Sequence, residues 1–371
     1  MKIAQVAPLI ESVPPRLYGG TERIVSYLTE ELVRLGHDVT LFASGDSVTT
    51  AELAPCCTRA LRLDATVRDS VPHFMLMIDK VRERAKEFDV CHFHIDFFHF
   101  PLFRSLAART LTTLHGRQDL ADLKPFYSRF GEMPLVSVSN DQRKPLSQAN
   151  YVATVHHGIP PDLHRPSFEQ GSYLAFLGRI SPEKRPDRAI RIAQCVGIPL
   201  KIAAKVDKVD EAYFRNDILP LIDGQRVEFL GEINEREKTA FLGDAAALLF
   251  PIDWPEPFGL VMIEAMACGT PVLAFRCGSV PEIVEDGVTG KVVGSEDEAI
   301  AALPEVLSYD RRAIRERFQE RFTATRMAGN YVKLYRKLLK MRADGGENPD
   351  FGRPRPEIIG SRDLSQKARL G

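Results

Sequence analysis

The sequence predicts an α/β protein built from two Rossmann-like, doubly wound domains that face each other across a cleft. The chain has 371 residues, and a usual domain size of roughly 100–200 residues suggests two domains. Short apolar runs alternate with amphipathic segments over residues 3–139, and the same alternation starts again at residue 173. Between the two series, residues 160–172 form a polar stretch with three prolines and no periodicity, which is typical of a linker.

The first series indicates a parallel sheet with helices between its strands. The helix expected over residues 21–35 has Ile24, Leu28, Leu32 and Leu35 at helical spacing, and Gly36 ends it. A second helix is expected over residues 71–88. The expected strands are residues 3–7, 38–43, 89–94, 110–115 and 135–139.

The second series repeats this arrangement. Its expected strands are residues 173–177, 200–204, 227–230, 247–251 and 271–275, and its expected helices are residues 185–196, 211–221, 235–244 and 259–268. After residue 295 the pattern is helical, through 311–318 and 323–340. We place the first domain at residues 1–165 and the second at residues 166–322. Residues 342–371 carry Gly, Pro and charge with little apolar content, so we expect a disordered tail there.

Composition narrows the classes of partner and compartment. The net charge of −1 gives no global field that would attract nucleic acid. The N-terminus is too quickly polar for a secretory signal, and no apolar run approaches the ~20 residues that a membrane span needs. The six cysteines show no metal-binding spacing. We expect a cytoplasmic protein without a nucleic-acid partner. Peripheral membrane contact stays open, although nothing indicates it.

The strongest motif lies on the loop and helix that follow the strand ending at residue 251. Glu256 falls on the loop, and Glu264 lies about two turns into the helix. The first helical turn offers unpaired backbone N–H groups and the positive end of the helix dipole, which suit a diphosphate. Gly259 lets an anion approach the backbone. A plain helix cap with a solvated Glu264 is the alternative, but apolar neighbours surround Glu264, and a half-buried carboxylate needs a partner.

A second motif sits at the carboxyl end of the first strand of the second series. Arg179 follows Gly178 directly, and Lys184 comes five residues after Arg179. Two cations at that spacing on a strand-to-helix loop can converge on one pair of phosphates. Exposed basic residues near a capped helix are the alternative. We favour the phosphate reading, because strand ends face the cleft in this fold class.

These two motifs resemble the donor-binding domain of the family 4 retaining glycosyltransferases, which have the GT-B fold. The family shows G-R-x-x-x-x-K followed by E-x-x-x-x-x-x-x-E, and both elements are intact here. The resemblance covers the chain to about residue 338 and is clearer in the second half. It implies that a helix over residues 323–341 crosses back to the first domain.

The resemblance also implies roles for individual residues. Arg179 and Lys184 would neutralise the donor diphosphate, and Glu264 would bind the ribose hydroxyls. Glu256 would hold the hydroxyls of the donor sugar. The remaining implied donor-binding residues in the second domain are Gly231, Glu232, Ile233, Phe258, Gly259 and Leu260.

The first half contributes weaker signals. Gly19 and Gly20 precede a helix and resemble the family's glycine loop, although two adjacent glycines fit a simple turn equally well. His115 ends a strand and matches the family's cleft histidine, which contacts the donor sugar. With Arg179, Lys184 and Glu256, it completes the set that the resemblance places in catalysis.

A metal site is a weaker interpretation of the histidines before and after residue 96. His92, His94 and His99 with Asp96 contain ligand types, yet phenylalanines dominate this stretch, and it fits an acceptor pocket better. The phenylalanines concerned are Phe97, Phe98 and Phe100. No D-x-D motif is present, so the protein's cations and a helix N-terminus would take the place of a metal. We expect neither metal nor cofactor, with the nucleotide sugar as co-substrate.

The resemblance therefore implies a metal-independent hexosyltransferase that acts with retention. UDP-glucose is the first choice of donor and GDP-mannose the second, on family frequency. The acceptor would be a small molecule, a lipid or a saccharide. Two alternatives remain, a nucleotide-sugar epimerase on the same fold and a non-catalytic module that binds nucleotide sugars. The loops of dehydrogenases, P-loop NTPases and α/β-hydrolases are absent from the sequence.

Overall fold

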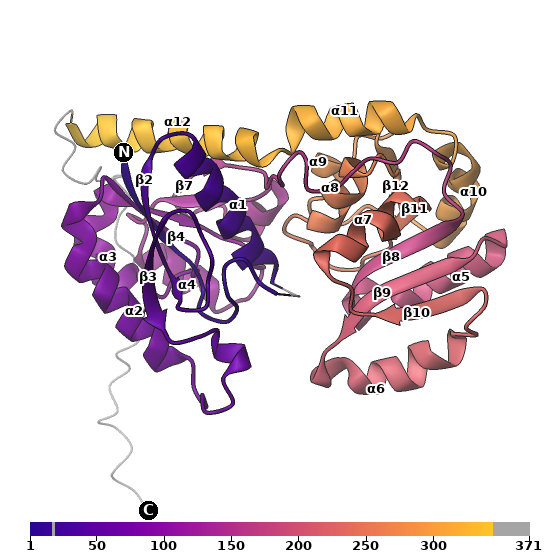
Figure 1. The fold of residues 1–371 in the computed structure, drawn as a ribbon, viewed down its shortest axis with the longest axis horizontal. Helices are drawn as coiled ribbons and strands as arrows, with labels where there is room; N and C mark the ends of the chain where they lie inside the picture. The colour runs from indigo at the N-terminus through magenta and orange to yellow at the C-terminus, as the bar shows by residue number, and fades with distance from the viewer. Residues whose placement is uncertain (17–18, 344–371) are drawn as a thin grey trace, which may run out of the picture.

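The computed structural model describes residues 1–16 and 19–343, and it shows two α/β domains side by side (Figure 1). The first domain holds a seven-stranded sheet in the order β3-β2-β1-β4-β5-β6-β7, and the second holds a six-stranded sheet in the order β10-β9-β8-β11-β12-β13. Neighbouring strands pair in parallel throughout the two sheets as described. The predicted fold class, two facing Rossmann-like domains, is confirmed.

The first sheet is covered by helices on both faces. Its strands are β1 (Lys2–Val6), β2 (Asp38–Ser44), β3 (Glu52–Cys57), β4 (Val90–Phe93), β5 (Thr110–Thr113), β6 (Leu135–Ser137) and β7 (Tyr151–Thr154). Its helices are α1 (Gly20–Arg34), α2 (Val71–Arg84), α3 (Phe100–Phe103) and α4 (Leu123–Arg129). The central strands β1 and β4 are almost wholly buried, which explains their continuous apolar runs.

The second sheet has the same construction. Its strands are β8 (Tyr173–Ile180), β9 (Leu200–Val206), β10 (Val227–Gly231), β11 (Ala245–Phe250), β12 (Val272–Phe275) and β13 (Gly290–Val293). Its helices are α5 (Pro186–Val196), α6 (Glu211–Tyr213), α7 (Glu235–Gly243), α8 (Leu260–Ala267), α9 (Val280–Ile283), α10 (Glu296–Val306) and α11 (Arg311–Arg321). The helix expected over residues 211–221 is irregular, because α6 passes into a π-helical stretch and then a short turn that contains Pro220.

The strands that the sequence pattern did not indicate are β3, β7 and β13, and all three lie at sheet edges. Strand β7 is only half-buried along its whole length, and β3 contains Pro55 and buries a single residue. An edge strand has one neighbour and less buried surface, so it lacks the continuous apolar run that marks a central strand.

The last helix, α12 (Ala324–Ala343), crosses from the second domain to the first (Figure 1). Helix α11 packs in the core of the second domain through Ile314 and Phe318, whereas α12 packs against β1 and α1 through Tyr331 and Tyr335. Helix α12 extends past the expected end at residue 341. The rest of the predicted tail, residues 344–371, lies outside the described residues. Within residues 1–16 and 19–343, no helix has the length and apolar composition of a membrane span.

A carboxylate joins the two domains close to this crossing. Glu282 of α9 accepts hydrogen bonds from the backbone N–H groups of Asn140 and Asp141 in the first domain, at 2.8 and 2.7 Å. The side chain of His156 lies 3.5 Å from the same carboxylate. Burial raises the pKa of Glu282, but the hydrogen bonds from His156, Asn140 and Asp141 outweigh it and lower the pKa to about 2.

This lowered pKa makes the Glu282 link dependent on pH. A carboxylate with a depressed pKa stabilises the folded state fully above its ordinary pKa of 4.5, and this contribution is lost as the pH falls from 4.5 toward 2. We expect Glu282→Gln to lower the free energy of unfolding at pH 7 by about 1–3 kcal/mol, and the difference from wild type to shrink below pH 4.5. Urea unfolding at a series of pH values measures this, with Glu285→Gln as control because Glu285 pairs with Arg317 and Arg321 of its own domain. A difference that is constant from pH 7 to pH 3 would contradict it.

Candidate active site

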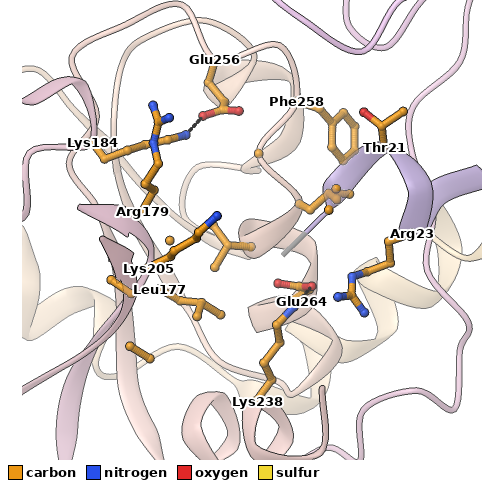
Figure 2. Close-up of a pocket in the computed structure, with 18 of the residues that line it drawn as sticks. Thr21, Arg23, Leu177, Arg179, Lys184, Lys205, Lys238, Glu256, Phe258 and Glu264 are labelled. Carbon is orange, nitrogen blue, oxygen red and sulfur yellow. Dashed lines mark hydrogen bonds and ion pairs between the residues drawn. The ribbon is translucent and has the colours of Figure 1, made fainter. Parts of the chain in front are cut away.

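A cavity of 410 Å³ lies between the domains, at the carboxyl ends of strands from both sheets. The second domain contributes the ends of β8, β9 and β11 (Figure 2), and the first contributes the start of α1, His115 two residues after β5, and the side chains Glu11, Arg62 and His157. The sequence-predicted residues that line the cavity are Gly19, Gly20, His115, Arg179, Lys184, Glu232, Ile233, Glu256, Phe258, Gly259, Leu260 and Glu264. Gly231, at the end of β10, is not among the lining residues. The two motifs and the cleft histidine therefore meet in one place.

Two helix N-termini face each other in this cavity. Gly259 caps α8 in a left-handed conformation with φ +80°, and no side chain caps the helix. A Cβ atom at Gly259 would lie 2.7 Å from the side chain of Met262, so space as well as φ requires glycine. Gly20 begins α1 across the cleft, and a Cβ atom there would lie 3.6 Å from the side chain of Leu260. Both helices thus direct unpaired N–H groups and a positive dipole end toward the same space.

Four cations of the second domain line the cavity (Figure 2); Lys238 pairs with Glu264, and the other three lie at strand ends or on the loop after β8. Arg179 lies near the end of β8, and its guanidinium is 2.5 Å from Glu183, 3.6 Å from Asp207 and 3.8 Å from Asp210. Lys184 forms an ion pair with Glu256.

The third cation is Lys205, near the end of β9, whose ammonium lies 2.9 Å from Asp207. The sequence interpretation missed Lys205, because no motif marks it. The rule that strand ends face the cleft could have found it.

Glu256 is held on a loop that a glycine makes possible. Its carboxylate takes the ion pair from Lys184 and a hydrogen bond of 3.1 Å from the indole N–H of Trp254. Its backbone carbonyl accepts from the N–H of Ser279 at 3.0 Å. Gly278 packs against this backbone, where a Cβ atom would lie 2.4 Å from the nitrogen of Glu256. Contacts to its carboxylate and contacts to its backbone therefore both hold Glu256 in place.

Glu264 is buried on the first turns of α8 and is 4% exposed. Lys238 of α7 lies 2.9 Å from its carboxylate. Burial raises the pKa of Glu264, but Lys238, His164 and Arg23 lower it more, so the carboxylate ionises below its ordinary pKa. Arg23 of α1 forms an ion pair with Glu235 of α7, which joins the two domains beside this site.

Glu264 also belongs to a group of side chains with metal-ligand spacing, and this is the one such group among the residues that the structure describes. His164, Glu235 and Glu264 place their ligand atoms within 4.8 Å of one another. Lys238 and Arg23 already bind the two carboxylates, so the local positive charge is supplied by protein side chains. The sequence interpretation named Glu264 but missed Lys238, Arg23 and His164, since none belongs to a recognisable motif.

His115 lies just beyond β5 at the first-domain wall of the cavity. The side-chain amide of Gln142 donates hydrogen bonds to the carbonyls of Leu114 and Gly116, at 3.0 and 2.8 Å, and so holds the backbone on both sides of His115. The ring of His157 stacks on His115 with a centroid distance of 5.1 Å. Burial lowers the pKa of His115 to about 3, so its imidazole is neutral at physiological pH.

The residues expected to form an acceptor pocket or a metal site have other contacts. His92 and His94 hydrogen-bond to Thr113 and Gln5 on the sheet, and His99 to Thr112. Asp96 adopts a left-handed backbone with φ +51°. Phe97, Phe98 and Phe100 pack with one another and with the core around α4, and none of them lines the cavity. Their expected place in an acceptor pocket therefore stays a prediction that the interdomain cavity does not support.

Comparisons with known proteins agree with this architecture. A family model described as Glycosyltransferase Family 4 matches residues 18–163, and one described as Glycosyl transferases group 1 matches residues 164–323. A D-inositol 3-phosphate glycosyltransferase from Mycobacterium avium is 35% identical over 163 residues, which are 39% of this chain and 38% of the relative. The chain thus matches well under half of that relative's length.

Solved structures extend the likeness to the whole fold. A sucrose-phosphate synthase from Thermosynechococcus elongatus is 20% identical and covers 91% of this chain and 99% of its own, with a TM-score of 0.71. The Anabaena protein Alr3699/HepE, in complex with UDP and glucose, is 18% identical and covers 91% of this chain and 100% of its own, with a TM-score of 0.68. At sequence identities of 20% and 18%, the likeness to these structures shows the fold alone.

The buried pair of Glu264 and Lys238 generates a prediction about stability. Lys238→Met leaves the Glu264 carboxylate buried without its nearest cation, and we expect it to lower the free energy of unfolding by about 3–5 kcal/mol. The double variant Lys238→Met with Glu264→Gln removes the stranded charge and should recover part of this loss. Urea unfolding of both variants measures the effect, and Lys238→Arg is the matched control. A double variant no more stable than Lys238→Met alone would show that the two side chains do not interact energetically.

Proposed function

The chain belongs to the family 4 glycosyltransferases of the GT-B fold, and on that premise we propose that it transfers a hexose from a nucleotide-diphosphate sugar to an acceptor hydroxyl with retention. One observation carries the proposal: two helix N-termini meet the cations Arg179, Lys184 and Lys205 in a single cavity between the domains. This combination suits a diphosphate, because N–H groups and cations stabilise the negative charge that grows on it as the sugar departs.

The proposed reaction breaks the bond between the anomeric carbon and the diphosphate oxygen. The electron pair of that bond goes to the leaving diphosphate, close to Arg179, Lys184 and the start of α8. The acceptor oxygen bonds to the anomeric carbon from the same face, and its proton goes to the departing phosphate. Glu256 is paired with Lys184 and Trp254, which favours a role in holding sugar hydroxyls over one as a nucleophile.

For the donor we propose UDP-glucose first and GDP-mannose second. Alr3699/HepE, a protein of the same fold, has been solved in complex with UDP-glucose, which supports the first choice by analogy. Glu264 in the second turn of α8 would take the ribose hydroxyls, and Glu232 and Ile233 would border the base. The acceptor, a small molecule, lipid or saccharide, would enter from the first-domain side, where Glu11 and Arg62 line the cavity and pair at 3.0 Å.

The alternatives differ in their products. An epimerase would convert the donor sugar without any acceptor, and a non-catalytic module would bind nucleotide sugars without turnover. Mass spectrometry of incubations with and without acceptor extracts separates the three functions. A new glycoside formed only with acceptor supports transfer.

The two cations of the proposed diphosphate site can be tested separately. We expect Arg179→Ala and Lys184→Ala each to lower kcat/KM for the donor on the order of 10²-fold, because each removes charge-assisted contacts to the diphosphate. Lys208→Ala is the control, since Lys208 is exposed near the end of β9 and does not line the cavity. Wild-type kinetics in both cation variants would refute their assignment.

Two measurements on the same reaction test its stereochemistry and its metal requirement. We expect NMR of the purified glycoside to show the anomeric configuration of the donor, and an excess of EDTA to leave the initial rate unchanged, because protein cations and helix N-termini neutralise the diphosphate. An inverted product would exclude the same-face reaction. A rate abolished by EDTA and restored by a divalent cation would exclude metal independence.

A further inference from the structure

We propose that a chain of hydrogen bonds running from Tyr335 through Gln5 and His94 fixes the tautomer of His115, so that Nδ1 of His115 presents a lone pair to a hydroxyl of the donor sugar. This inference rests on the proposed function and assigns positioning roles to Tyr335, Gln5 and His94. It also gives the crossover helix α12 a part in donor recognition, because Tyr335 belongs to that helix.

The chain is continuous from helix to cavity. The Gln5 amide nitrogen donates to the hydroxyl of Tyr335 at 3.1 Å, and its carbonyl oxygen lies 2.8 Å from Nε2 of His94. Nδ1 of His94 lies 2.9 Å from Nε2 of His115, which lines the cavity. Tyr335, Gln5 and His94 are at most 3% exposed, so water does not compete for these bonds.

The direction of each bond follows from the orientation of the Gln5 amide. Its carbonyl oxygen can only accept, so His94 carries its proton on Nε2 and donates it to Gln5. A neutral imidazole has one N–H, so Nδ1 of His94 is bare and must accept from Nε2–H of His115. Nδ1 of His115 is then bare in turn. Among the described residues, none hydrogen-bonds to Nδ1 of His115.

The far end of the chain can be assigned in the same direction. The Gln5 amide nitrogen has no lone pair, so the proton of Tyr335 goes to Nδ1 of His92, which lies 2.8 Å from the hydroxyl oxygen. His92 then carries its proton on Nε2, 2.8 Å from the hydroxyl of Thr113. In this arrangement Nδ1 of His92 also faces the Gln5 amide nitrogen at 3.4 Å. With the amide reversed, the Tyr335 hydroxyl and the His92 ring would no longer both find complementary partners without a further tautomer change.

The three rings are neutral and held in place. Burial lowers the pKa of His92 and His94 well below the ordinary value and that of His115 to about 3, so each ring has one proton to give. His157 stacks on His115 with an interplanar angle of 16° and itself contacts Phe258 of the second domain. The lone pair on Nδ1 of His115 therefore has a fixed direction.

A bare Nδ1 accepts a hydrogen bond and cannot donate one. The donor-sugar group that it recognises must carry an O–H, so a fluorine at that position would be as unfavourable as a hydrogen. An Nδ1–H tautomer would instead favour fluorine over hydrogen, because fluorine accepts weakly and hydrogen not at all. Specificity for a hydroxyl is thereby set by residues that do not touch the sugar.

The first experiment reads the tautomers directly and needs neither donor nor activity. In protein labelled with ¹⁵N-histidine, long-range ¹H–¹⁵N correlation spectra assign which nitrogen carries the proton. We expect N–H on Nε2 and a bare Nδ1 at His115 and His94. Tyr335→Phe should introduce the second tautomer at His94 and His115, whereas Tyr331→Phe, one turn earlier on α12 and bonded to Thr113, should not. A protonated Nδ1 on His115 in wild type, or spectra of His115 identical in both tyrosine variants, would overturn the proposal.

The second experiment measures recognition with 3-, 4- and 6-deoxy and deoxyfluoro analogues of UDP-glucose. At one position, both analogues should lower kcat/KM equally in wild type, on the order of 10-fold. His94→Leu should lower kcat/KM for UDP-glucose by a similar factor. In this variant, the deoxy and deoxyfluoro analogues at that position should give the same kcat/KM as UDP-glucose. His94→Gln keeps an acceptor for His115 and should restore part of the loss. Fluorine outperforming hydrogen at that position would overturn the proposal. Absence of any turnover with UDP-glucose would count against the proposed donor, while the spectra still decide the tautomer.

Discussion

The approach of two helix N-termini across the interdomain cleft is the constraint on which the rest of the structure depends. Helices α1 and α8 begin at Gly20 and Leu260, close enough that a side-chain atom of Leu260 would touch a Cβ at Gly20. Like dipole ends repel each other, so this arrangement stores unfavourable electrostatic energy unless negative charge lies between or beside the helices. Glu22, in the first turn of α1, lines the same cavity, whereas Glu256 and Glu264 are already paired with Lys184 and Lys238.

The contacts between the domains include polar pairs beside the cavity and beyond it, and an apolar seam along α12. Beside the cavity, Arg23 pairs with Glu235, and farther along, Glu282 accepts from the backbone at Asn140 and Asp141. Helix α12 covers the first domain through an apolar face. Polar groups that separate can exchange their partners for water, whereas opening the apolar seam of α12 would expose apolar surface. The geometry therefore ties the domains firmly along α12 and leaves the cavity side adjustable.

The sequence predicted the central framework and the residues that lie in recognisable motifs. Buried strands such as β1 and β8 show continuous apolar runs, and Arg179 and Lys184 keep a fixed spacing beside a strand end. The edge strand β7 escaped prediction because half-burial leaves no distinct pattern. Lys238 could not be foreseen as the partner of Glu264, because two helices bring them together only in the folded protein. Phe97 and its neighbours lie outside the cavity, and composition could not show this, because it indicates that aromatic rings cluster but not what they pack against.

Two walls of the cavity differ in their polar groups, which are charged on the second-domain wall and neutral around His115. The second-domain wall uses full charges held in ion pairs, and these can exchange partners when another anion arrives. The wall at His115 uses neutral groups in a buried chain of hydrogen bonds, and such a chain has two opposite directions with few intermediate states. Charges without fixed direction suit a diphosphate, whose negative oxygens point many ways. A directed lone pair suits a single hydroxyl. Because α12 provides both the apolar seam and the Tyr335 end of that chain, the element that holds the domains together also sets the direction of the neutral wall.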